Sequence, residues 1–127
     1  MERNAAEGGS PAAAEGEVLT QLDILIRLYE GAIRFLDEAI AACEAGQVAS
    51  FKERLGRGRR IIEEFRKTLD FERGGAVPSQ LDDLYAFMLD SLAQAELTHE
   101  VPYIQRVVEQ LRTLLEGWRG AKTAGIP

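Results

Sequence analysis

The sequence is poor in the residue types that catalytic and metal-binding sites most often need. It contains one cysteine, Cys43, and one histidine, His99. A lone cysteine forms no internal disulfide, which suits a reducing compartment, and a lone histidine does not supply the paired Glu-x-x-His motifs of di-metal bundles. Neither a nucleophile–base pairing nor a glycine-rich phosphate loop is recognisable. We therefore expect a protein that is not an enzyme and that binds no cofactor and no metal.

Long apolar runs and a surplus of positive charge are also missing. No apolar stretch approaches the roughly 20 residues that span a bilayer, and the Ala- and Glu-rich start lacks a signal-peptide pattern. The formal net charge is −6, whereas binding to nucleic acid needs concentrated Lys and Arg. We therefore expect a cytoplasmic protein with no membrane insertion and no nucleic-acid partner.

One segment departs from the acidic balance of the chain. Residues 47–73 hold eight Lys/Arg against five Asp/Glu, and the local cluster consists of Arg54, Arg57, Arg59 and Arg60. These positions scatter around a helix, so the simpler interpretation is a solvated face. Contact with an acidic partner is the alternative.

Four segments of about 20 residues repeat apolar side chains at spacings of three and four, the pattern of amphipathic helices. They cover about 20–45, 48–69, 78–97 and 102–120. Short links join them and no strand pattern competes, which predicts an all-α fold, an antiparallel up-down four-helix bundle. We assign residues 18–122 to the bundle, residues 1–17 to a disordered N-terminal tail and residues 123–127 to a flexible C-terminal tail.

Three residues carry structural expectations of their own. Gly58 lies on the apolar seam of the second segment, so we expect a neighbouring backbone to approach it closely. Phe71 is expected to fold back as a plug under the loop that follows this segment. Cys43 lies on the seam of the first segment, which predicts a buried, inert thiol.

The predicted helices carry more apolar surface than their central seams require. The extra side chains lie at the margins of the stripes and are Ile26, Leu28, Phe35, Ile61, Leu84, Phe87, Val107 and Leu114. Bundle helices bury about three positions in seven, which accounts for part of this set. The other interpretation is a groove between helices that accepts an amphipathic helix. We take these eight residues as the candidate partner-binding set.

Two further functions are compatible with this pattern. A structural or adaptor bundle would use the same margins to homo-oligomerise. A histidine phosphotransfer domain would use His99, but its working histidine lies exposed in the middle of a helix, whereas His99 falls in a predicted turn. The phosphotransfer domain is therefore the less favoured alternative, and we expect His99 to be a solvated or capping residue.

Four stretches of the sequence together resemble the flagellar secretion chaperone family FliS. They are LYEGAIRFLDEAI at 28–40, IIEEFRKTLDFERGG at 61–75, LDDLYAFM at 81–88 and the helix that ends at Trp118. Their order and spacing agree with the family over about 18–122. The resemblance implies a cytoplasmic, non-enzymatic four-helix bundle. It also implies that the chain binds the C-terminal segment of flagellin, prevents premature polymerisation and assists delivery to the flagellar type III export gate.

The resemblance also implies how the ligand is bound, and the sequence departs from the family in one region. In the family, the flagellin segment wraps around the bundle and folds partly into helices in surface grooves, which costs ordering energy. Family members usually carry a tyrosine in the N-terminal segment, but residues 1–17 contain none, and Thr20-Gln21-Leu22-Asp23 replaces the usual proline-containing lead-in. A cap over the groove by residues 1–17 would have to form without that tyrosine. We expect a monomer or a weak dimer.

Overall fold

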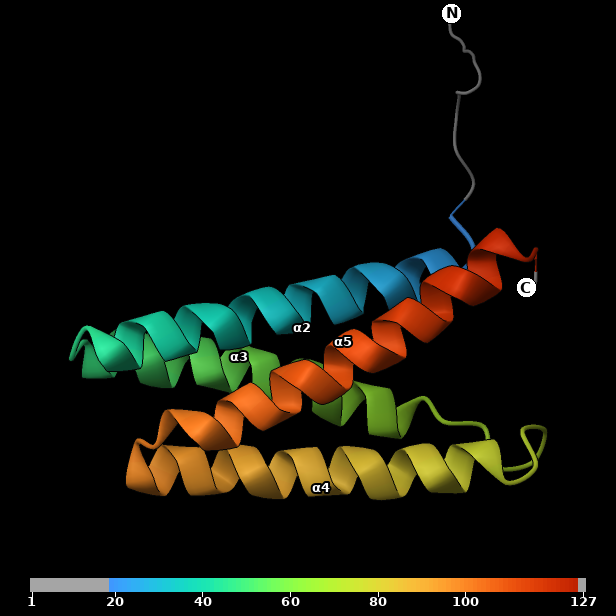
Figure 1. The fold of residues 1–127 in the computed structure, drawn as a ribbon. Helices are drawn as coiled ribbons and strands as arrows, with labels where there is room; N and C mark the ends of the chain where they lie inside the picture. The colour runs from blue at the N-terminus through green and yellow to red at the C-terminus, as the bar shows by residue number, and fades with distance from the viewer. Residues whose placement is uncertain (1–18, 126–127) are drawn as a thin grey trace, which may run out of the picture.

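The computed structural model describes residues 19–125, and every regular element in this range is an α-helix. The helices are α2 (Gln21–Glu44), α3 (Val48–Lys67), α4 (Val77–Thr98) and α5 (Val101–Thr123). Successive helices run in opposite directions (Figure 1). The predicted all-α, antiparallel four-helix bundle is therefore confirmed. The tail expected at residues 1–17 lies outside the described residues.

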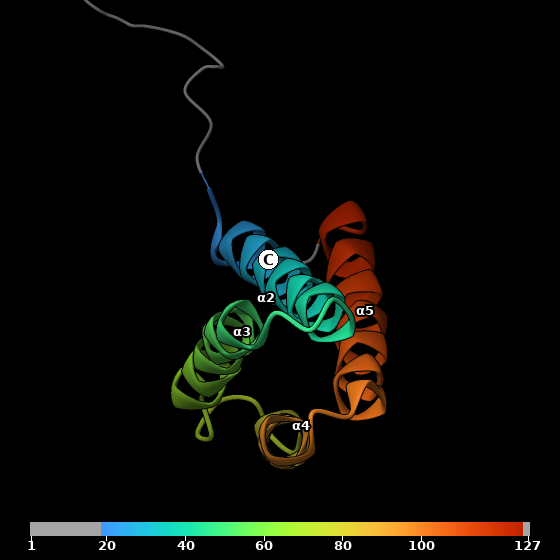
Figure 2. The same ribbon diagram turned by 90° about the vertical axis from the view of Figure 1, so that its left-hand side faces the viewer.

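The four helices form a square in which each helix packs against its two neighbours. α2 contacts α3 and α5, and α4 contacts the same two helices from the opposite corner (Figure 2). α5 lies beside α4 near their connection and crosses toward the start of α2 at its other end (Figure 1). The N-terminal half of α4 is consequently less covered by α5 than the C-terminal half.

The first helix begins at a reciprocal cap that the sequence analysis did not identify. The Asp23 backbone N–H donates to Thr20 Oγ1 at 3.0 Å, and the Thr20 N–H donates to Asp23 Oδ2 at 3.1 Å. Such a capping box satisfies two N–H groups that an unprotected helix start would leave unpaired. The spacing of Thr20 and Asp23, which replaces the proline-containing lead-in, could have indicated this cap.

The core is built from the predicted seams. Its largest fully buried side chains are Tyr29, Tyr85, Phe51, Leu36, Leu55, Ile62, Met88, Leu92, Ile104, Leu111 and Val107. The Tyr29 ring stacks on Phe65 with a centroid distance of 4.5 Å, and Trp118 packs edge-on to Tyr29 at 6.3 Å. This aromatic group joins α2, α3 and α5 near one end of the bundle.

Gly58 shows why the α2–α3 contact is close. A Cβ atom at this position would lie 2.6 Å from Leu36 Cδ2, which is shorter than any ordinary carbon contact, and 3.7 Å from the Ala32 carbonyl oxygen. A neighbour does approach Gly58 closely, but it is the Leu36 side chain and not the backbone that we expected.

Two other single-residue expectations were wrong. Phe71 is 57% exposed in the connection between α3 and α4, where the buried Pro78 ring packs against Gly74 and Leu69 packs against the core. Cys43 is half-buried rather than buried, and its thiol donates to the His99 carbonyl oxygen at 3.3 Å.

Candidate partner-binding surfaces

The bundle has four edges, where an edge is the outward-facing side between two neighbouring helices. Two opposite edges are bridged by ion pairs. The α2/α5 edge carries Glu30–Arg119, Asp37–Arg112 and Asp23–Lys122. The α3/α4 edge carries Arg66–Asp82 and Arg59–Glu96. Charged side chains therefore cross both of these edges at several levels.

The Arg66–Asp82 contact is the most specific of these bridges. Arg66 Nε donates to one carboxylate oxygen at 2.7 Å and its terminal nitrogen donates to the other at 3.2 Å. This two-pronged contact lowers the pKa of the Asp82 carboxyl and raises the pKa of the Arg66 guanidinium. An apolar ligand would have to break such pairs to enter this edge.

The remaining two edges, α2/α3 and α4/α5, have few charged bridges, and we call them the open edges. Within residues 19–125, the α2/α3 edge has one interhelical ion pair, Arg54–Glu38 at 3.3 Å, and the α4/α5 edge has none. A hydrogen bond from Ser91 Oγ to the Tyr103 carbonyl oxygen, at 3.0 Å, links α4 to α5 instead. The open edges face opposite sides of the square (Figure 2).

The α2/α3 edge contains a groove of about 420 Å³. Its lining is apolar at the floor and polar at the rim: Leu25, Leu28, Phe35, Ile61 and Phe65, with Arg57, Arg60, Glu64 and Thr68. Leu28 is 40% exposed, and Phe35 and Ile61 are half-buried. Three of the eight predicted site residues therefore come together here. Leu25 was not among the predicted site residues but also lines the groove, as its spacing of three from Leu28 could have indicated.

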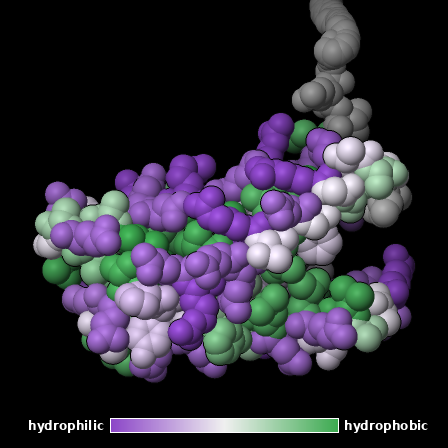
Figure 3. All heavy atoms as spheres, in the orientation of Figure 1, coloured by the Kyte–Doolittle hydropathy of each residue, from purple (hydrophilic) through white to green (hydrophobic). Residues whose placement is uncertain are grey.

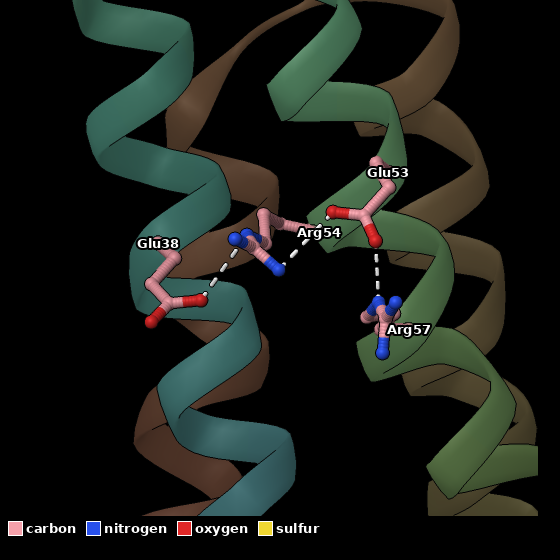
Figure 4. Close-up of polar contacts among 4 residues, drawn as sticks. All are labelled: Glu38, Glu53, Arg54 and Arg57. Carbon is pink, nitrogen blue, oxygen red and sulfur yellow. Dashed lines mark hydrogen bonds and ion pairs between the residues drawn. The ribbon is translucent and has the colours of Figure 1, made fainter.

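Arginines surround the Phe35 end of this groove. The guanidinium carbons of Arg34 and Arg57 lie 5.2 Å and 5.6 Å from the Phe35 ring centroid, within the range of cation–π attraction. Figure 4 shows Glu53 reaching both Arg54 and Arg57, while Arg54 also reaches Glu38 across the edge. The hydrogen bond from Arg57, helped by the charge of the neighbouring arginines, lowers the pKa of Glu53.

Helical spacing places three more predicted site residues at the α4/α5 edge, because Leu84 lies about one turn before Phe87 on α4 and Leu114 lies about three turns after Tyr103 on α5. Leu84 and Leu114 are half-buried against the core, and Phe87 is 46% exposed. Phe87 borders a shallow hollow of about 370 Å³ that Asp90, Ser91, Ala93, Gln94, Tyr103 and Arg106 complete. Figure 3 shows apolar side chains gathered over the N-terminal half of α4, where α5 has crossed away.

Two predicted site residues do not lie on a surface. Ile26 is 8% exposed and Val107 is fully buried, so both belong to the core. α2 and α5 each pack against two neighbouring helices. With one neighbour, a side chain at the margin of the apolar stripe would stay exposed, but the second neighbouring helix covers it. The expectation that these two side chains line a groove directly is corrected.

In residues 19–125 the side chains that could ligate a metal ion lie apart from one another. No group of three or more His, Cys, Asp and Glu side chains in this range could hold a metal ion. His99 ends α4 in the left-handed conformation, with φ at 59°, and its ring packs edge-on to Phe51 at 5.0 Å. None of the four helices is both long and apolar enough to cross a membrane.

The fold and the apolar α2/α3 groove define a class of protein: a helical bundle with a surface groove of the kind that accepts an amphipathic segment. Comparison with known proteins then supplies the family. The family model described as "Flagellar protein FliS" matches residues 10–125. The chain belongs to this FliS family, as its sequence motifs indicated.

Individual relatives agree with this assignment. The chain is similar to the flagellar secretion chaperone FliS of Vibrio cholerae, with 34% identity over 95 residues, covering 75% of this chain and 70% of the relative. It is 33% identical over 93 residues to the protein of the same name from Salmonella typhimurium, covering 72% and 69%. Its family is thus one of chaperones rather than enzymes.

A solved structure shares the fold. A bacterial flagellar chaperone known from a crystal structure superposes with a TM-score of 0.76, covering 89% of this chain and 94% of the other, at 23% sequence identity. The antiparallel bundle is therefore preserved across wide sequence divergence.

Proposed function

We propose that this protein is a flagellin export chaperone that binds the disordered C-terminal segment of flagellin. One observation carries the proposal beyond family membership. The predicted margin residues that stay partly exposed gather on two opposite edges, and these are the edges with the fewest charged bridges. Apolar surface without a covering element is the feature expected of a protein that binds amphipathic segments.

The candidate contacts divide between the two open edges. Leu28, Phe35 and Ile61 would bind one amphipathic helix of the flagellin segment in the α2/α3 groove. Leu84, Phe87 and Leu114 would bind a second one along the α4/α5 edge. Ile26 and Val107 would support these surfaces from the core. Because the edges face opposite sides, a single segment that uses both must pass around the bundle.

Such binding would be stoichiometric and would require no chemical step. The segment exchanges its disorder for helices, so part of the gain from burying apolar surface is offset by ordering the chain. While bound, the segment is withheld from contacts with other flagellin molecules, which would prevent premature polymerisation. We place this activity in the cytoplasm, in a monomer or weak dimer that assists delivery to the flagellar type III export apparatus.

Calorimetry with the full chain and the C-terminal segment of flagellin from the same bacterium tests the proposal. Saturable binding with a negative heat-capacity change is expected, because apolar surface becomes buried. Phe87→Asp should weaken binding at least about tenfold, since a carboxylate in an apolar contact is poorly solvated, with little change in thermal unfolding. Leu97→Asp is the matched control, because Leu97 is 78% exposed on the same helix and does not line the Phe87 hollow. A folded, monomeric sample that binds no segment would contradict the function.

A further inference from the structure

We propose that the α2/α3 groove selects a helical segment that carries carboxylates beside its apolar face, and that Arg34, Arg57 and Arg60 hold those carboxylates at the Phe35 end. The proposal rests on flagellin binding and names the chemistry of the segment that occupies this groove. Family membership alone specifies no such charge preference.

The shape of the groove sets the length of its ligand. Its α2 side runs from Leu25 to Phe35, which at 1.5 Å per residue is about 15 Å. A helix of about three turns fills this length. The floor offers leucine, isoleucine and phenylalanine side chains, so the buried face of the ligand must be apolar. Shape and floor together define an amphipathic helix but do not fix its direction.

Charge is unevenly distributed along the groove, and this asymmetry sets the direction in which a helix binds. Four guanidinium groups, Arg34, Arg54, Arg57 and Arg60, surround the Phe35 end with two carboxylates, Glu38 and Glu53. Four positive charges against two negative ones leave a local surplus of +2. Farther along α3 the rim is formed by Glu64 and Thr68. A bound helix should therefore place its negative charges near Phe35.

Two arginines at the Phe35 end are available to bind a carboxylate of the ligand. Glu53 already uses Arg57 (Figure 4), and its lowered pKa shows that this position favours an anion. Within residues 19–125, Arg34 and Arg60 contact no carboxylate of the chain. Both remain able to donate hydrogen bonds to an incoming carboxylate.

The second open edge does not share this preference. Around Phe87 an aspartate, Asp90, and an arginine, Arg106, flank the hollow together, and α4 contains no Lys or Arg in its 22 residues. Selection of an acidic segment is therefore a property of the α2/α3 groove alone. The two halves of a wrapped ligand should differ in charge.

Affinity measurements with a charge reversal on the groove rim test this inference. The probe is the C-terminal flagellin segment of the same bacterium, alone and with every Asp and Glu changed to Asn or Gln. Arg60→Glu should weaken binding of the natural segment about tenfold at low salt, because an attraction becomes a repulsion. The loss should shrink in 1 M NaCl, where the screening length is about 3 Å, and should be absent for the neutralised segment. Lys52→Glu, the same change at an exposed position of α3 that does not line the groove, should bind within about twofold of the unchanged protein, as expected for an exposed charge outside the contact.

The outcomes separate this inference from the proposed function. If Arg60→Glu binds the natural segment as tightly as the unchanged protein while Phe87→Asp loses binding, flagellin binding stands and charge selection is wrong. If the unchanged protein binds no flagellin segment, the proposed function is wrong. Two model helices with one apolar face, flanked by Glu in one and Lys in the other, then test the groove directly. Tighter binding of the Glu helix supports the inference, and equal affinity contradicts it.

Discussion

Tyr29 of α2 and Tyr85 of α4 share a buried hydrogen bond between their hydroxyl groups, across the diagonal of the bundle. The two helices do not neighbour each other in the square, so this bond links corners that only the core connects. Phe65 of α3 lies against both rings, with centroid distances of 4.5 Å and 5.4 Å. A buried polar contact within the core thus links α2 to α4, the two helices at opposite corners of the bundle.

Removing one hydroxyl of this pair should destabilise the fold. Tyr85→Phe leaves the Tyr29 hydroxyl buried without its partner, which costs about 1–3 kcal/mol in the free energy of unfolding. The double change to phenylalanine should cost less than the sum of the single changes, because it removes both polar groups together. Denaturant unfolding of the four proteins measures these differences, and additive losses would contradict a direct hydrogen bond.

The same pair should make the fold sensitive to alkali. Burial raises the pKa of both Tyr29 and Tyr85 above the ordinary value of 10.0. A raised pKa in the folded state means that this stabilising contribution is complete below pH 10 and is lost as pH rises further. The unfolding temperature of the natural protein should therefore fall above pH 10, and the Tyr29→Phe/Tyr85→Phe protein should show a smaller fall. If the unfolding temperature of both proteins falls equally, groups other than these two tyrosines cause the sensitivity to alkali.

The close contact at Gly58 gives a prediction about packing. Gly58→Ala would place a methyl group against Leu36 Cδ2, and overpacking of this kind costs about 1–3 kcal/mol. Gly117→Ala is the matched control, because its new methyl would meet nothing within 4 Å and alanine favours a helix by about 1 kcal/mol. Thermal unfolding should thus move in opposite directions for the two variants. A stabilised Gly58→Ala protein would show that Leu36 moves aside freely.

Most of the fold could be predicted from the sequence because apolar spacing reports directly on which face of a helix is buried. The seams through Tyr29, Phe51 and Met88 are the core of the structure. The apolar spacing did not predict burial correctly where a side chain is covered by a second neighbouring helix. Val107 lies at the margin of its stripe, yet two neighbouring helices cover it. The sequence also did not show that Phe71 would stay exposed while Pro78, seven positions later, is buried beside Gly74.

The candidate surfaces could be predicted only in part. Stripe margins identified Leu28 and Phe87, but no spacing within one helix shows which edge two helices form together. Ion pairs such as Glu30–Arg119 join residues 89 positions apart, and it is these distant pairs that distinguish bridged edges from open ones. The arginines near Phe35 had been interpreted as scattered around α3. Of that cluster, Arg57 approaches the Phe35 ring together with Arg34 of α2, and this shared contact became visible only in three dimensions.

Asp23 gives a prediction at the acidic end of the pH range. Its hydrogen bond with Lys122 and the cap with Thr20 lower its pKa from 3.8 to about 2. A lowered pKa contributes stability that is complete above pH 3.8 and is lost as pH falls toward 2. Asp23→Asn should therefore lower the unfolding temperature at neutral pH, and the difference from the natural protein should shrink as pH falls toward 2. Asp83→Asn, which removes a carboxylate that makes no ion pair within residues 19–125, is the charge control.

In the proposed binding mode, one partner segment occupies both open edges and neither bridged edge. Methyl NMR of the full chain, titrated with the C-terminal segment of flagellin, tests it most directly. We predict that methyl signals of Leu28 and Ile61 on one edge, and of Leu84 and Leu114 on the other, shift together and saturate at one stoichiometry. Signals of Ile33 and Leu115, which border the ion-paired α2/α5 edge, should shift far less. Shifts confined to Ile33 and Leu115, or no shifts from a folded sample, would contradict the account.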